Sequence, residues 1–447
     1  MAVKLGRKFE REVSAVFIAL FLFAVAWQAV FLFAGLETSN QKLRPIKEPK
    51  VGLPASSLTP WVCGVWMHPG MFGFEKDAAT AKIREALDSY VQAGINTVIM
   101  LVKDTSGYVF YQSDIGAKAP RYDWDFFGVF LEEARKRNLT VHPWFCVFPE
   151  SALVGKVREH PEWLIVGPGR EMVRTVNPAL PEVRAYEISL MAELVKKYGA
   201  DWVHLDYIRF PCEPTEPYFS HDARTKQLFK EQTGIDFDAL KARDSGNPYW
   251  NVWLEWNREQ VTRFVRELRE ELAKTGRQVK ISAAVFPDAD NARVLIGQDW
   301  EAWAKLGLVD MLCPMLYTND TTLFAELTKR AVTIGKIARN AGGQKIGSGN
   351  ISTAVGSIST APAVTVARAK GQNIQNIKGA ATASTLPVVL ICPGIGIGTS
   401  HNQATPEIML EEIRLAREAG ANGVIFFSGG SLKEEFLKAL ADWRKSK

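Results

Sequence analysis

Two polar side chains interrupt an otherwise apolar stretch at residues 202–208, Trp-Val-His-Leu-Asp-Tyr-Ile. The β-branched and aromatic residues of this stretch favour extended backbone. Because side chains alternate between the two faces of a strand, His204 and Asp206 share one face, while Val203 and Leu205 lie on the other. A carboxylate on a buried face is costly unless partners satisfy it or function retains it. Asp206 is therefore the first candidate catalytic residue.

Short apolar segments alternate with amphipathic segments whose apolar residues recur every three or four positions. This alternation predicts a parallel sheet with crossover helices. Eight strands make a (β/α)8, or TIM, barrel, which residues 59–447 can hold with insertions at 211–248 and 347–386. An open doubly wound sheet is the alternative, but no glycine-rich phosphate loop follows the first strand. The expected strands are 61–67, 96–102, 140–148, 202–208, 279–286, 309–317, 387–393 and 423–428.

In a barrel, active sites form at the carboxyl-terminal ends of the strands. His204 and Asp206 would point into the barrel, with Asp206 nearer that end, whereas Tyr207 would face the helices. Asp288 and Asp320 follow later strands and are the further candidate catalytic residues. Other polar and aromatic side chains near the ends of strands are expected to contact the substrate: Trp66, His68, Lys103, His142, Trp144, His204 and Tyr317.

Carboxylates beside aromatic side chains suit carbohydrate chemistry. One acid protonates the leaving oxygen, while a second acts as a nucleophile or activates water. Aromatic rings supply broad apolar contact beneath a sugar ring. The sequence therefore predicts glycoside hydrolysis with a polysaccharide as substrate.

The run Asp-Tyr-Ile-Arg-Phe-Pro, residues 206–211, resembles the signature of the glycosyl-hydrolase-like ten family. That resemblance implies a (β/α)8 barrel and hydrolysis of envelope or environmental polysaccharides. It adds Arg209 and Asp299 to the substrate-binding candidates, and Asp299 and Glu150 to the contenders for the second carboxylate. The 347–386 insertion departs from the family pattern. Further similar blocks occur in the family's order at 93–103, 140–149, 177–211, 297–320 and 416–428.

Residues 13–36 form an apolar segment after a basic start, with Ser14 and Gln28 as its only polar side chains. A membrane-spanning helix needs about 20 apolar residues, whereas the core of a signal peptide usually has 7–15. We therefore expect an N-terminal anchor helix in residues 1–36, followed by a tether at 37–58. The barrel is expected outside the cytoplasm, periplasmic or extracellular, and secreted if the helix is cleaved.

The charge distribution limits the class of partner. A net charge of +5 over 447 residues, without a compact basic motif interleaved with aromatics, argues against nucleic acid. The region 329–378 carries Lys and Arg without Asp or Glu, which indicates a solvated basic face or contact with an anionic polymer or lipid surface. Five cysteines without CxxC, and the absence of HExxH, predict no structural zinc site, and no cofactor is expected.

Two other functions fit the same residues. A catalytically inactive barrel could bind glycans or envelope partners, because no second acid is assigned. A metal-dependent hydrolase could use His68, His142, His204 and Asp206. Strand one lacks the His-x-His pair usual in such barrels, ending instead in Val-Trp-Met-His.

Overall fold

The computed structural model describes residues 60–212, 217–240, 246–341, 389–399 and 402–445. The expected helix at 13–36, the tether at 37–58 and the 347–386 insertion lie outside these residues. Among the described helices, none combines the length and apolar character that a membrane span requires. Only the start of the basic region 329–378 is described, and there Arg330 is paired with Asp288 and Asp290.

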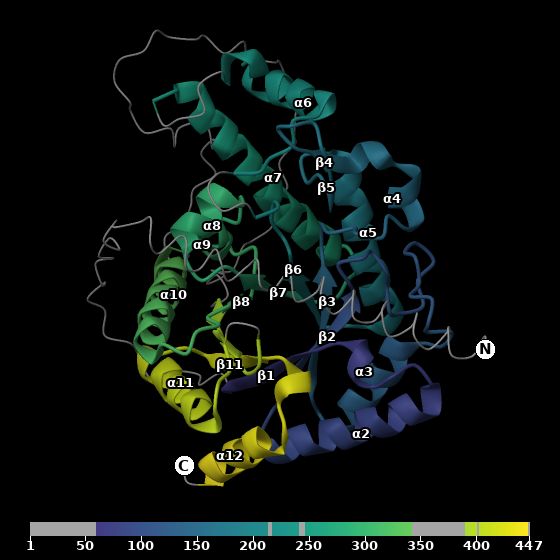
Figure 1. The fold of residues 1–447 in the computed structure, drawn as a ribbon, viewed down its shortest axis with the longest axis vertical. Coiled ribbons are helices and arrows are strands. Elements are labelled where there is room, and N and C mark those ends of the chain that lie inside the picture. The colour runs from purple at the N-terminus through teal and green to yellow at the C-terminus, as the bar shows by residue number, and fades with distance from the viewer. Residues whose placement is uncertain (1–59, 213–216, 241–245, 342–388, 400–401, 446–447) are drawn as a thin grey trace, which may run out of the picture.

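The core of the fold is a nine-stranded parallel sheet that curls on itself (Figure 1). β9 pairs with β8 and β10 pairs with β11, so the segment 390–396 joins the two edges. A bridge between Met315 and Gly394 adds to this closure. The sheet is thus TIM-barrel-like, as predicted. In spatial order its strands are β10 (Gly394–Gly396), β11 (Gly423–Phe427), β1 (Val62–Met67), β2 (Thr97–Lys103), β3 (Thr140–Cys146), β6 (Trp202–Asp206), β7 (Lys280–Val285), β8 (Met311–Pro314) and β9 (Leu390–Ile391).

Helices surround the sheet (Figure 1). Several end as their sequences predict: α2 and α5 stop at Gly94 and Gly199, which adopt the left-handed conformation that glycine tolerates. The longer helices are α2 (Lys76–Ala93), α3 (Phe126–Lys136), α5 (Pro181–Tyr198), α6 (Ala223–Thr233), α7 (Pro248–Ala273), α10 (Thr321–Ala341), α11 (Pro406–Ala419) and α12 (Glu434–Lys445). Short elements are α4 (Gly155–Glu159), α8 (Ala289–Leu295), α9 (Trp300–Lys305), η1 (Pro69–Met71), η2 (Pro161–Trp163), η3 (Phe237–Leu240), η4 (Gly429–Ser431) and the antiparallel pair β4 (Leu164–Val166) and β5 (Met172–Val176).

Strand β6 shows how the sheet separates two apolar cores. Val203 and Leu205 pack in the large core between sheet and helices, while Trp202 packs in the smaller core inside the barrel. The face predicted for these residues is therefore confirmed. Tyr207 is an exception. The strand ends at Asp206, and a backbone φ of 51° at Tyr207 turns its ring against the interior core instead of the helices.

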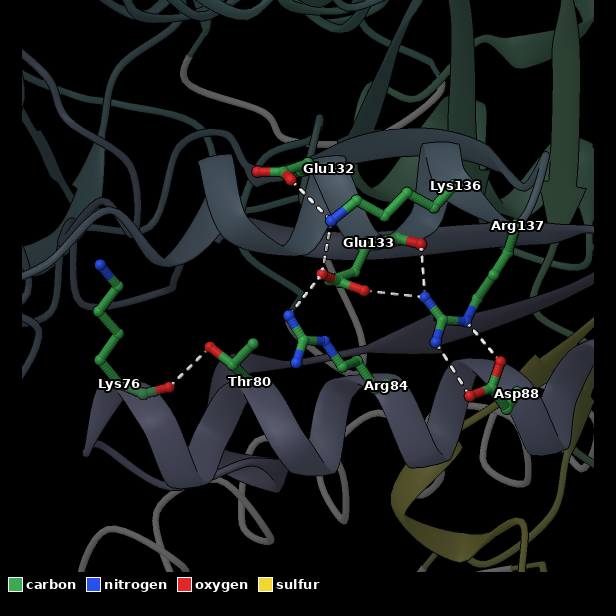
Figure 2. Close-up of polar contacts among 8 residues, drawn as sticks. All are labelled: Lys76, Thr80, Arg84, Asp88, Glu132, Glu133, Lys136 and Arg137. Carbon is green, nitrogen blue, oxygen red and sulfur yellow. Dashed lines mark hydrogen bonds and ion pairs between the residues drawn. The ribbon is translucent and has the colours of Figure 1, made fainter.

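An ion-pair network joins helices α2 and α3 (Figure 2). The Glu133 carboxylate lies 3.1 Å from Arg84 of α2, 3.0 Å from Lys136 and 2.9 Å from Arg137. Arg137 in turn contacts both oxygens of Asp88 at 2.7 and 2.9 Å. Hydrogen bonds from Arg84, Lys136 and Arg137 lower the pKa of Glu133 to about 2, although partial burial opposes them. The network ties two neighbouring helices of the outer layer together.

Candidate active site

Asp206 ends strand β6, at the carboxyl-terminal end of the barrel that we call the rim. Its Oδ2 accepts a 3.1 Å hydrogen bond from the indole N–H of Trp144, and its Oδ1 accepts the backbone N–H of Tyr207 at 2.7 Å. The side chain is only 7% exposed. Burial raises the pKa of Asp206, while the charge of Arg209 and the two hydrogen bonds act in the opposite direction. The carboxylate is thus held in a fixed orientation and in an environment that tunes its pKa upward.

Aromatic side chains lie around this carboxylate. The Tyr317 ring stacks on Phe427 with a centroid distance of 5.2 Å, and Phe427 meets the edge of Trp66 at 6.0 Å. Burial and then the charge of Asp206 raise the pKa of Tyr317. Tyr207, Tyr317 and Phe427 are half-buried. Such rings can pack against the apolar face of a sugar.

Arg209 is a buried cation beside Asp206. Its guanidinium carbon lies 4.4 Å from the centroid of the Tyr207 ring and 4.9 Å from that of Phe286, and Nη1 donates to the Cys212 sulfur at 3.4 Å. Nε and Nη2 have no hydrogen-bond partner among the described residues. The positive charge therefore acts on Asp206 through space, and two of the three guanidinium nitrogens have no partner among the described residues.

His142 and His204 lie deeper in the barrel and are joined through Ser282. Trp66 donates its indole N–H to Nε2 of His204 at 3.0 Å, so the proton of that ring is on Nδ1, 2.9 Å from the Ser282 oxygen. The Ser282 oxygen is also 2.9 Å from Nδ1 of His142, which stacks on Trp202. Burial lowers the pKa of both histidines, that of His204 to about 3. Both are fully buried neutral groups, and we assign them to packing of the interior rather than to substrate contact.

Lys103 does not occupy the face that the strand pattern predicts. A register shift after Leu101 turns its ammonium toward the helix layer, where it lies 3.2 Å from Glu187 of α5 and 2.8 Å from Glu150. All three side chains are buried. Alternation along β2 predicts Lys103 on the interior face with Ile99 and Leu101, and that prediction is wrong. Ion pairing explains both Lys103 and Glu150.

Three of the aspartates proposed from sequence begin helices. Asp288 caps α8 and lies 3.1 Å from Arg330, and Asp299 caps α9 and lies 3.3 Å from Arg258. Asp320 is exposed and accepts two backbone N–H groups at the start of α10. Carboxylates stabilise helix N-termini through such bonds. Helix capping accounts for all three, and we assign none of them a catalytic role.

His68 follows strand β1, is half-buried, and has a pKa lowered by burial. The four groups of the metal hypothesis do not assemble. The Nε2 lone pair of His204 already accepts the Trp66 proton, and both Asp206 oxygens accept N–H groups. Within the described part of the chain, no cluster of three or more His, Cys, Asp or Glu side chains could hold a metal ion.

One rim carboxylate escaped the sequence analysis. Asp104 directly follows β2, and its Oδ1 accepts the backbone N–H groups of Ser106 at 2.9 Å and Tyr108 at 3.1 Å. Burial raises its pKa to about 6. The signal was present, because an acid directly after a barrel strand lies at the rim.

Comparisons with known proteins agree on one family and one fold. A family model described as glycosyl hydrolase-like 10 matches residues 61–350. Glycosyl hydrolase YngK of Bacillus subtilis (strain 168) is 25% identical over 265 residues, covering 52% of this chain and 48% of that protein. Glycosyl hydrolase DigH of Escherichia coli (strain K12) is 24% identical over 269 residues, covering 52% and 57%. The chain thus spans about half the length of these curated relatives.

The solved structure of the PgaB (BpsB) glycoside hydrolase domain from Bordetella bronchiseptica has a similar fold. The TM-score is 0.61 at 11% sequence identity, over 86% of this chain and 98% of that chain. At this level of identity the likeness shows the fold alone.

Proposed function

Because this chain belongs to the glycosyl hydrolase-like 10 family, we propose that it hydrolyses glycosidic bonds of a polysaccharide with Asp206 as a catalytic carboxylate. One observation carries the proposal. At the rim of the barrel, Asp206 is oriented by Trp144 and by the Tyr207 backbone, among half-buried aromatic rings. Few structural tasks require an acid in that position, since it makes no ion pair with a described residue within 4.0 Å.

Burial favours the neutral form of Asp206, but polar partners counter it and support the charged form. Two N–H groups and the charge of Arg209 favour a carboxylate, which can activate water or attack the anomeric carbon. Burial works against that charge, so the group is not an ordinary surface aspartate. Tyr317 and Tyr207 would position the sugar beside it.

The test is hydrolysis by the purified full-length chain. The chain is incubated with a panel of envelope polysaccharides, and the release of reducing ends is measured with and without enzyme. Release from at least one polysaccharide is expected. Binding to a polysaccharide without any release would contradict hydrolysis and support the inactive glycan-binding barrel.

We further propose that residues 13–36 anchor the protein in a membrane, with the barrel outside the cytoplasm. The support is their length and apolar composition after a basic start. Cell fractionation compares the full chain with a chain lacking residues 1–36. The full chain should sediment with membranes and the shortened chain should not. Equal partitioning of the two would contradict the anchor.

A further inference from the structure

Asp104 and Asp206 lie at the ends of two strands that flank a third. β2, β3 and β6 are neighbours in the sheet, and Cys146 at the end of β3 pairs in register with Asp206. The charges of Asp206 and Asp104 both contribute to the raised pKa of Cys146, after burial. Two strand spacings of about 4.8 Å separate the backbones of the two acids by about 10 Å. Both carboxylates thus act on one buried thiol at the end of β3.

The alternation of side chains along β2, continued by one residue, places Asp104 on the interior side of the sheet. Lys103 points to Glu187 in the helix layer, and neighbouring residues of an extended chain point to opposite faces. The charge of Asp104 acts on Cys146, which packs in the interior core, while the charges of Lys103 and Glu150 act on Asp104 from the helix layer. The same register shift that removes Lys103 from the rim therefore brings Asp104 to it.

Asp104 also has an oxygen available for a ligand. Its Oδ1 holds the turn formed by Ser106 and Tyr108, whereas its Oδ2 accepts no hydrogen bond from the described residues. The residue is half-buried, and Oδ2 is not among the buried atoms that lack partners. In Asp206, by contrast, both oxygens accept N–H groups. The two acids at the rim are therefore in different environments, as acid and base partners require.

We propose that Asp104 is the second catalytic carboxylate of this site and donates the proton to the leaving oxygen. This inference rests on the proposed function. The glycosidic C–O bond breaks with its electron pair on the leaving oxygen, which takes the Asp104 proton. Water supplies the hydroxyl group at the anomeric carbon, and its remaining proton passes to the Asp206–Asp104 pair and restores the acid. A pKa of about 6 keeps much of Asp104 protonated at mildly acidic pH.

The substitution Asp104→Asn tests the assignment, because the amide oxygen can still hold the turn but the amide cannot donate an acidic proton. Full-length wild type and variant are compared on the polysaccharide that the wild type cleaves and on 4-nitrophenyl glycosides of its sugars. We expect a loss of about 10²–10⁴-fold on the polysaccharide. The loss should be much smaller on the nitrophenyl glycoside, whose leaving group needs no proton. The decline of wild-type kcat/KM above about pH 6 should disappear in the variant.

Asp236→Asn is the matched control, because Asp236 also accepts a backbone N–H in a turn but is exposed and pairs with Lys230. If Asp104→Asn proves unstable in thermal unfolding, Asp104→Ser keeps a turn-forming oxygen and takes its place. Wild-type activity in the Asp104 variant, with Asp206→Asn inactive, would overturn the role of Asp104 alone. Equal losses on both substrates would also overturn it, since they indicate a structural effect. Full activity of both variants would refute the proposed function itself.

Discussion

The indole N–H of Trp144 on β3 donates a 3.1 Å hydrogen bond to Oδ2 of Asp206 on the neighbouring strand β6. Both side chains are at least nine-tenths buried. The bond stabilises the charged form of Asp206 in surroundings that otherwise favour the neutral form. It links the packing of the barrel interior to the protonation of the proposed catalytic group.

Trp144→Phe keeps an aromatic ring but removes the donor. The pKa of Asp206 should rise further, since the lost bond favoured the carboxylate. The acidic limb of the kcat/KM profile should therefore move to higher pH, and kcat should fall roughly 10-fold or more, as a hydrogen bond to a charged group suggests. Trp300→Phe is the control, because its indole N–H has no hydrogen-bond partner among the described residues. An unchanged pH profile in Trp144→Phe would contradict this role.

Lys103→Met should destabilise the protein by about 3–5 kcal/mol, because it leaves Glu150 and Glu187 buried without their cation. Urea unfolding followed by circular dichroism measures the loss. Lys136→Met, whose ammonium pairs with Glu132 and Glu133 at the surface, should change the stability little. A stable Lys103→Met protein with impaired substrate binding would instead indicate that Lys103 reaches the substrate.

Ser282→Ala removes the hydroxyl group shared by His142 and His204 and should cost about 1–3 kcal/mol. Ser89→Ala, on the exposed face of α2, is the control.

The wild-type protein should also lose stability in acid. The folded pKa of His204 is about 3 and its ordinary value is 6.5, so the unfolded chain binds the proton first as pH falls between these values. If the stability of His204→Phe decreases with falling pH as steeply as that of wild type, protonation of His204 is not the cause of the loss.

Glu133→Gln should destabilise the protein by about 1–2 kcal/mol at neutral pH, since three cations lose their shared anion. The pKa of Glu133 lies below its ordinary value of 4.5, at about 2. Its contribution is therefore complete above about pH 4.5 and is lost as pH falls toward 2. The difference from wild type in urea unfolding should shrink over that range. Glu132→Gln, which affects Lys136 alone, should change little, and an equal effect of both would contradict the network in Figure 2.

The alternation of strands and helices, with its period of two inside each strand, predicted much of this fold. It assigned Trp202 to the interior and Val203 and Leu205 to the helix layer. It failed where backbone irregularities interrupt the period. The register shift after Leu101 turns the Lys103 side chain to the opposite face of the sheet. The left-handed conformation of Tyr207 turns its ring inward. Both depend on pairing with neighbouring strands or on tertiary packing, which local sequence does not specify.

The candidate site was partly predictable for a related reason. Asp206 followed from its place at the end of an apolar strand. Asp288 and Asp299 also follow or lie near strands, but each directly precedes a short helix. Because aspartate is a preferred N-cap residue, both could have been predicted as helix caps. Asp104 shares the position of Asp206 at the end of a strand, yet its interior direction depends on the reversal of Lys103.

The rate of reducing-end release by Asp206→Asn tests the central claim most directly. Asparagine keeps the shape of the side chain, and Asp201→Asn is the control, because Asp201 is an exposed residue paired with Arg277 just before the same strand. Asp206→Asn should lose about 10²–10⁴-fold in kcat with a folded structure, while Asp201→Asn keeps the wild-type rate. A folded Asp206→Asn protein that cleaves the polysaccharide at the wild-type rate would contradict the account.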